Sequence, residues 1–194
     1  MKPPTSPALG DGRHRCGWCT DDARYVDYHD LEWGVPEHDP RALFELLTLE
    51  GAQAGLSWLT VLKRRDGYRR AFADFDVDAV AGFDDERVEQ ILADPGVIRH
   101  HQKVRSVVTN ARAILRLRTE TTFGDFAEYV WSIATSASDS FVIARAMNQR
   151  LAKDGFTFVG PTICRSFVQA AGMVNDHEPD CFRRGSGGQN LAVE

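Results

Sequence analysis

The chain has 194 residues, which is enough for one domain with a real hydrophobic core or for two small lobes that share a cleft. It is 43% hydrophobic and 26% charged, as in an ordinary soluble protein, and no apolar run approaches the roughly 20 residues that cross a bilayer, so we expect no membrane partner. The net charge of −5 argues mildly against a nucleic-acid partner, although a local basic face can still bind phosphate groups.

The N-terminal segment, residues 1–13, is rich in Pro, Gly and Ser, and we expect it to be disordered. It lacks the apolar core of a signal peptide, so the sequence predicts a cytoplasmic protein. Four cysteines do not make a disulfide framework in a chain of this size, and in a reducing compartment they favour thiol or metal roles.

An aromatic block extends from Cys16 to Pro36 and contains Trp18, Tyr25, Tyr28 and Trp33. Asp21 or Asp22 can cap a short helix within this block. Such a helix would place on one side the residues Tyr25, Tyr28, His29 and Glu32. A stripe of aromatic side chains at this spacing is most often part of a core.

The rest of the chain is organised around residues 39–62. Asp39 can cap a helix that Pro40 enters at its first position. On a helical wheel, one face of this helix carries Leu43, Leu46, Leu47, Glu50 and Ala54. A carboxylate on such a face loses water, so Glu50 must be hydrogen-bonded internally, have a raised pKa or meet a ligand. Two nearby glycines, Gly51 and Gly55, permit close approach of a ligand or of another helix, and Trp58 follows directly, which favours the ligand.

A second helix is predicted from about Ser57 to Phe72, and it carries a basic run that is most often a solvated face. Two short helices follow at 75–83 and 84–94, and then a long one from about His100 to Arg118. The Pro-Gly turn before the long helix can present backbone N–H groups and a helix start to a phosphate, although such turns are also common without a ligand. The candidate DNA-contacting residues in this region are Gly96, Arg99 and Lys103.

The C-terminal third is predicted to be helical as well. Helices are expected at 123–133, in a segment that stops at Gly155, and at 161–177, with a Ser-rich link before the second of them. Residues 182–194 have the composition of a disordered tail. Helical periodicity dominates and almost nothing alternates with period two, so we predict an all-α fold.

The spacing of cysteine and histidine suggests a metal site but does not establish one. His177 and Cys181 are four residues apart, and Cys16 with His29 would complete a tetrahedral Cys2His2 set for zinc. The competing interpretation is a redox pair of Cys16 and Cys19, but the βαβ surroundings of a thioredoxin-like motif are absent. Four protein ligands would leave no open position, so such a zinc would be structural and would pin the two ends of the chain together.

Five segments, in this order, resemble the bacterial 3-methyladenine DNA glycosylase I family. They are RCGW (15–18), YHDLEWGVP (28–36), LEGAQAGLSWLTVLK (49–63), VIRHHQKVRSVVTNARA (97–113) and GFTFVGPTICRSFVQAAGMVNDH (155–177). The resemblance covers residues 14–181. It implies one domain with a helix-hairpin-helix DNA glycosylase fold, the hairpin region around 84–118, and base excision repair of alkylated DNA.

The resemblance also assigns residues. It implies one structural zinc per chain, held by Cys16, His29, His177 and Cys181, and gives no role to Cys19. It places in the pocket for the damaged base Glu50, Tyr28 and Trp58, with Trp18 and Tyr25 near it by position. The sequence departs from the family after Trp131, where the segment before the next helix looks shortened. A DNA contact or packing support supplied by that segment would be lost.

The expected chemistry follows from the pocket. A member of this family would extrude the damaged nucleotide from double-stranded DNA. Tyr28 and Trp58 would stack on the cationic purine, and Glu50 would accept hydrogen bonds from its edge while water attacks C1′. The methylated base is a good leaving group and no lysine stands out as a nucleophile, so we expect release of free 3-methyladenine without strand cleavage. We also expect the protein to act as a monomer. Leu56 is a candidate wedge for the vacated stack and is equally plausible as a core residue.

Two other classes of protein share some of these features. A zinc-pinned helical module that binds DNA without catalysis would keep the hairpin and the metal, but it has no reason to point Glu50 into an aromatic pocket. A zinc hydrolase would need a ligand position open to water. Release of free base from methylated DNA separates these alternatives.

Overall fold

The computed structural model describes residues 11–134 and 139–185. Its helices are α1 (Ala23–Asp27), a π-helical turn (Tyr28–Glu32), α2 (Pro40–Gln53), α3 (Trp58–Leu62), α4 (Arg65–Ala71), a 3-10 turn (Ala73–Phe75), α5 (Val77–Ala81), α6 (Asp85–Ala93), α7 (His101–Glu120), α8 (Phe126–Ala134), α9 (Ser140–Lys153) and α10 (Pro161–Ala170). No β-strand occurs in the described ranges, which confirms the all-α prediction. None of the helices in those ranges combines the length and apolar character that a membrane span needs.

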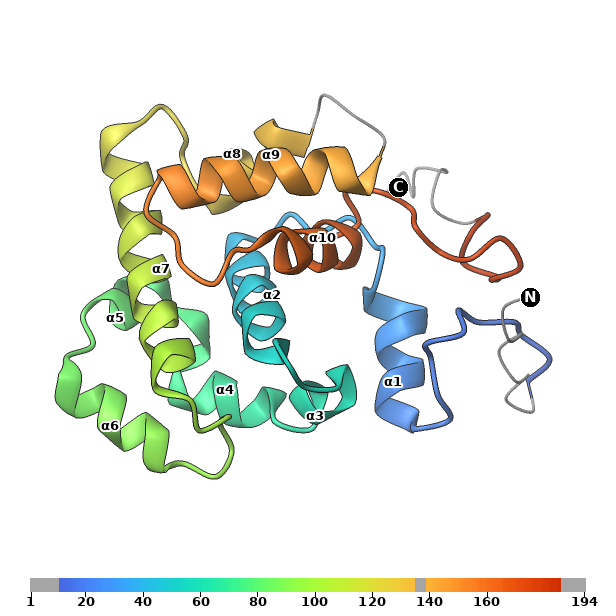
Figure 1. Ribbon diagram of the computed structural model, residues 1–194, viewed down its shortest axis with the longest axis horizontal. Helices are drawn as coiled ribbons and strands as arrows, with labels where there is room; N and C mark the ends of the chain where they lie inside the picture. The colour runs from blue at the N-terminus through green and yellow to red at the C-terminus, as the bar shows by residue number, and fades with distance from the viewer. Residues whose placement is uncertain (1–10, 135–138, 186–194) are drawn as a thin grey trace, which may run out of the picture.

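Helix α2 runs through the middle of the fold, with α7, α8 and α10 packed around it (Figure 1). Its start is the predicted one, because the Asp39 carboxylate accepts a hydrogen bond from the Ala42 N–H at 2.8 Å and Pro40 occupies the first turn. Leu43 and Leu47 of this helix are fully buried. The packing fixes the direction of α2, so its last turn, which contains Glu50, points toward α1 and α3 (Figure 1).

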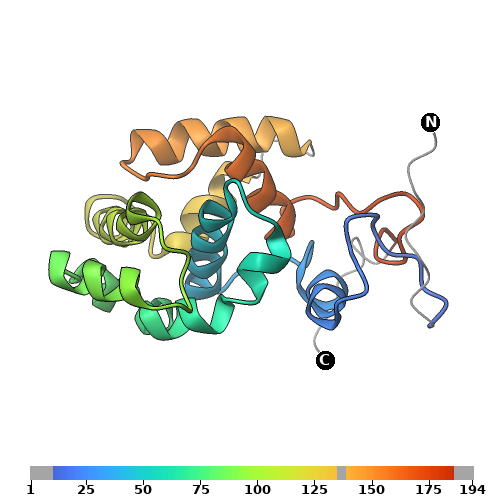
Figure 2. The same ribbon diagram turned by 60° about the horizontal axis from the view of Figure 1, so that its bottom comes forward.

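The two ends of the described chain lie side by side at one end of the molecule (Figures 1 and 2). The Phe182 N–H donates to the His14 carbonyl at 2.9 Å, and the Arg184 guanidinium donates to the His177 carbonyl at 2.7 Å. We expected residues 11–13 and 182–185 to belong to disordered tails, but they form part of this end of the molecule. The rest of both expected tails and most of the Ser-rich link, at 135–138, lie outside the described residues.

Two predicted helices differ from the observed ones. The helix expected from Ser57 to Phe72 is divided into α3 and α4 by a turn at Lys63 and Arg64, where Arg64 has φ −107° and ψ 0°. The helix expected at 161–177 ends at Ala170. Gly172, in the left-handed region at φ +68°, turns the chain there, and a Cβ at this position would lie 2.3 Å from the carbonyl carbon of Val35.

Candidate active site and metal centre

A cavity of about 210 Å³ opens between the aromatic N-terminal block and the last turn of α2. The residues that line it are Trp18, Tyr25, Tyr28, Trp33, Glu50, Gln53, Trp58, Ser166 and Gln169. The structure thus brings together every residue that we predicted for base binding or catalysis. A second cavity of about 490 Å³ is lined by three of the same residues, Glu50, Gln53 and Ser166, and extends past Leu56 to the start of α10.

The π-helical turn after α1 distributes the aromatic block between different parts of the protein. Asp22 caps α1 by accepting from the Arg24 N–H at 3.0 Å. Tyr28 then lines the cavity, His29 faces the metal cluster described below, and the Glu32 carboxylate accepts from Arg65 at 2.6 Å. Tyr25 and Tyr28 both line the cavity, but His29 faces the metal cluster, so the expectation that all four side chains share one side is not met.

Glu50 is 5% exposed, and its carboxylate has no hydrogen-bond or ion-pair partner among the described residues. Burial alone raises its pKa to about 8. The internal alternative, a carboxylate satisfied by a backbone donor or an arginine, is therefore not what the structure shows. Two buried donors of the same cavity, the Tyr28 hydroxyl and the Trp58 indole N–H, also lack a partner within the described part of the chain.

Unpartnered buried polar groups of this kind are rare, because each one forgoes the hydrogen bonds it would make in water. Here one carboxylate and two donors line a single cavity with aromatic walls. Tyr28 and Trp58 have ring centroids 5.2 Å apart at 48°, and Trp18 lies 5.1 Å from Trp33. Aromatic faces and a carboxylate together suit a flat ligand with donors, acceptors and positive charge.

Four lining residues were not predicted from the sequence as part of the site: Trp33, Gln53, Ser166 and Gln169. Gln53 lies three positions after Glu50 on α2, so helical spacing alone could have indicated it. Trp33 belongs to the aromatic block. Ser166 and Gln169 lie three apart on α10, more than 100 residues away in sequence, and only the packing of α10 against α2 brings them to the cavity.

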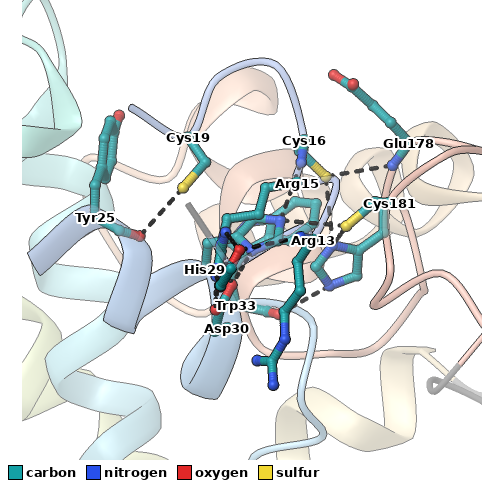
Figure 3. Close-up of polar contacts among 12 residues, drawn as sticks. Arg13, Arg15, Cys16, Cys19, Tyr25, His29, Asp30, Trp33, Glu178 and Cys181 are labelled. Carbon is teal, nitrogen blue, oxygen red and sulfur yellow. Dashed lines mark hydrogen bonds and ion pairs between the residues drawn. The ribbon is translucent and has the colours of Figure 1, made fainter. Parts of the chain in front are cut away.

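Four buried side chains form a metal-binding cluster, Cys16, His29, His177 and Cys181, with their donor atoms all within 4.8 Å of one another (Figure 3). The Sγ of Cys181 lies 3.4 Å from both His29 Nε2 and His177 Nδ1, and the Sγ of Cys16 lies 3.4 Å from His177 Nδ1. Ordinary zinc–sulfur and zinc–nitrogen bonds at tetrahedral angles give an S···N separation of about 3.6 Å. The donor set and its geometry therefore fit a tetrahedral metal ion.

Outer hydrogen bonds orient both imidazoles of the cluster. His29 Nδ1 is 2.8 Å from an Asp30 carboxylate oxygen, and the buried Arg15 guanidinium also donates to Asp30, at 2.7 Å. His177 Nε2 is 3.2 Å from the Trp33 carbonyl oxygen. With these nitrogens engaged, the other nitrogen of each ring faces the two sulfur atoms, which is the arrangement that metal-binding histidines need.

Cys19 is separate from the cluster. Its Sγ is directed to the Tyr25 carbonyl oxygen, 3.7 Å away, whereas Cys16 faces the histidines (Figure 3). The alternative of a Cys16–Cys19 redox pair is therefore not supported by the geometry, since both sulfurs have other partners.

The four residues that we predicted to contact DNA differ in their exposure and in their hydrogen bonds. Arg99 is exposed, and no described residue pairs with its guanidinium. Leu56 is 40% exposed, so it is not a core residue. The Gly96 N–H donates to the Asp94 carboxylate at 2.6 Å and is not free in this conformation. Lys103 is 8% exposed, and its ammonium donates to two carbonyl oxygens at the end of α2.

Comparison with known proteins gives consistent matches over most of the chain. Residues 18–184 match the family described as Methyladenine glycosylase. DNA-3-methyladenine glycosylase 1 of Escherichia coli (strain K12) is 47% identical over 179 residues, which cover 86% of this chain and 95% of that protein. A crystal structure of 3-methyladenine DNA glycosylase I is 46% identical with a TM-score of 0.80, covering 87% of this chain and 98% of the other. The Staphylococcus aureus enzyme, from a structural study of 3-methyladenine recognition, is 32% identical with a TM-score of 0.81, covering 88% and 96%.

Proposed function

The chain belongs to the methyladenine glycosylase family and acts as a 3-methyladenine DNA glycosylase I in base excision repair, and we propose that Glu50, Tyr28 and Trp58 recognise the damaged base. The observation that carries this assignment is the buried, unpartnered Glu50 carboxylate in an aromatic cavity. A base inside duplex DNA cannot reach such a cavity, so the enzyme must extrude the nucleotide.

Recognition depends on charge as well as shape. A purine methylated at N3 is cationic while it is still attached to the sugar, and the rings of Tyr28 and Trp58 attract a cation held over their faces. A positive charge near Glu50 also favours the ionised carboxylate, which then accepts hydrogen bonds from the purine edge. An intact adenine is neutral, so it gains neither interaction and is bound less well.

Hydrolysis then needs little assistance. Breaking the glycosidic bond releases the methylated purine as a neutral molecule, and a water molecule attacks C1′ of the sugar. Glu50 stabilises the positive charge that develops, because a carboxylate in a buried site of low dielectric interacts strongly with nearby charge. Lys103 donates to two backbone carbonyls and is not directed at the cavity, so it is not a nucleophile that would cleave the strand.

The metal is structural zinc, one ion per chain. Two thiolates and two imidazoles are the donor set of structural zinc sites, and four protein ligands leave no position for water. The ion would supply fixed geometry and no chemistry to the reaction. A zinc hydrolase is excluded as an alternative on the same ground.

Exposed basic side chains around the hairpin would hold the DNA backbone without reading sequence. Arg99 lies on the turn between α6 and α7, and the exposed Arg70 of α4 has Nη2 3.3 Å from the place where a Cβ of Gly96 would be. Leu56, in the turn after α2, is placed beside the cavity and would fill the stack that the extruded nucleotide leaves. The product of the reaction is free 3-methyladenine.

The assay is release of free base from a methylated DNA duplex, followed by chromatography, with a gel to detect strand breaks. The native chain should release 3-methyladenine and leave the strand intact. Glu50→Gln should lower the rate about 100-fold or more, because it removes the charge and keeps the shape. The exposed Glu120→Gln is the matched control and should behave as the native chain. Full activity of Glu50→Gln would remove Glu50 from the mechanism, and no release by the native chain would refute the assigned reaction.

A further inference from the structure

Lys103 occupies an unusual position for a lysine. It lies in the first turn of α7, where the helix dipole disfavours a positive charge. Its side chain turns into the protein, and its Nζ donates to the carbonyl oxygens of Ala52 at 2.9 Å and Ala54 at 2.7 Å. No carboxylate pairs with it in the described ranges. Because a buried charge is costly without strong partners, these two carbonyls are what holds the ammonium in place.

The carbonyls belong to the end of α2, where helical carbonyls lack partners from the helix itself. Ala54 is the residue at which the chain leaves the helix, with ψ at 112°, and Gly55 follows in the left-handed region at φ +81°. A cation is favourable at this end of a helix dipole. Lys103 therefore caps the turn of α2 that carries Glu50 and holds the start of the loop that carries Leu56.

The backbone of Lys103 belongs to the helix that follows the hairpin turn. The turn at residues 94–100 directly precedes α7, and it is held on its far side by α4, where the backbone of Gly67 contacts that of Gly96. The Tyr68 hydroxyl, also on α4, accepts from the Ile98 N–H at 3.4 Å. Lys103 thus joins a hairpin that faces the DNA backbone to the helix end that faces the base.

We propose that Lys103 is a positioning residue. It fixes the start of α7 to the carbonyl end of α2 and so keeps Glu50 and Leu56 in register with a DNA strand bound at the hairpin. The inference rests on the proposed function, since it concerns how DNA binding and base recognition are coordinated. The competing role is a direct contact from Lys103 to a DNA phosphate, which would require the side chain to leave both carbonyls and turn to solvent.

The test compares Lys103→Met, which keeps the apolar stem and removes the donors, with Lys153→Met, which removes one exposed positive charge at the end of α9. Single-turnover release of 3-methyladenine is measured at saturating enzyme and at a temperature where both variants are folded. The salt dependence of binding to a duplex with a non-cleavable abasic analogue is measured in parallel. We expect a rate at least tenfold below the native value in Lys103→Met, a native salt slope, and native behaviour in Lys153→Met. Lys103→Arg, which keeps charged donors, should recover part of the rate.

Two results would overturn the proposal. One is a single-turnover rate within twofold of the native chain, because a residue that only supports the fold changes the melting temperature without changing the rate. The other is a salt slope reduced by about one unit, which indicates a lost phosphate contact. If Lys103→Met does not fold, Lys103→Gln takes its place in both measurements. Failure of the assigned reaction itself is recognised separately, because the native chain would then release no base.

Discussion

Tyr28 and His29 are consecutive in sequence but belong to the two different centres of the protein. Tyr28 lines the aromatic cavity, with its ring 5.2 Å from that of Trp58, whereas His29 faces the metal cluster, with its ring 5.2 Å from that of Trp18. Trp18 and Trp33 line the cavity as well, and the Trp33 carbonyl holds His177 of the cluster. One wall of the aromatic cavity is therefore supported by the residues of the metal cluster.

This relationship predicts that losing the metal impairs base binding. Cys16→Ala should lose the one equivalent of zinc measured by elemental analysis and should bind free 3-methyladenine at least tenfold more weakly by calorimetry, because the wall is no longer fixed. Cys19→Ala is the matched control, since Cys19 lies outside the cluster, and it should keep both properties. Zinc retained by Cys16→Ala would mean that the ligands are assigned wrongly.

The raised pKa of Glu50 predicts a specific pH dependence of stability. Its pKa is about 8 in the folded protein and near the ordinary 4.5 in the unfolded chain, so between these values the unfolded chain has lost a proton that the folded one retains. Rising pH then lowers the free energy of unfolding by up to about 1.4 kcal/mol per pH unit, and the loss is complete above the folded pKa. Glutamine has no such proton. In urea unfolding, the stability advantage of Glu50→Gln should grow from pH 5 to 8 and stay constant above; an advantage independent of pH would contradict the burial of an unpartnered carboxyl.

The side chain of Leu56 should affect excision from duplex DNA but not the binding of free 3-methyladenine. Leu56→Ala removes an exposed side chain beside the cavity, so we expect little change in melting temperature or in binding of free 3-methyladenine, and at least tenfold slower excision from duplex DNA. Leu31→Ala is the matched control, because Leu31 is 70% exposed and does not line the cavity. Excision by Leu56→Ala at the native rate would remove the proposed wedge.

The contact between Gly67 and Gly96 should be essential for the hairpin. A Cβ at Gly67 would lie 2.2 Å from the Gly96 carbonyl oxygen, closer than any real contact, so Gly67→Ala must displace the turn from α4. We expect affinity for an abasic-analogue duplex to fall at least tenfold while zinc content and free-base binding stay native. Gly82→Ala, where the added Cβ makes an ordinary 3.4 Å contact, is the control. Unchanged DNA affinity in Gly67→Ala would show that the hairpin does not hold the duplex.

The features that could be predicted from sequence are mainly local. Asp39 caps α2 through a hydrogen bond three residues away, and Gly155 ends α9 in the left-handed region at φ +88°. The position of Glu50 on the buried face also follows from helical spacing alone. The four residues of the metal cluster are different: their two halves lie far apart in sequence, and only the family resemblance indicated that they meet.

Lys103 shows what local reasoning cannot provide. Its place beside a Pro-Gly turn with basic neighbours suggested a solvent-facing contact with DNA, yet its side chain points to α2. The direction of a side chain in the first turn of α7 depends on which element packs there, and the carbonyls it meets are about 50 residues earlier in the chain. The same limit applies to Gln169, which reaches the cavity from α10.

The metal cluster cannot form until all four of its residues, Cys16, His29, His177 and Cys181, have been synthesised. On a ribosome, the first pair emerges well before the second, and closing so long a loop costs chain entropy that the complete cluster helps to offset. The wall formed by Trp18, Tyr28 and Trp33 is therefore secured only after His177 and Cys181 have been synthesised. Prematurely terminated chains that lack the last dozen or so residues of the described range would carry Glu50 and the hairpin, but no finished receptor for the lesion.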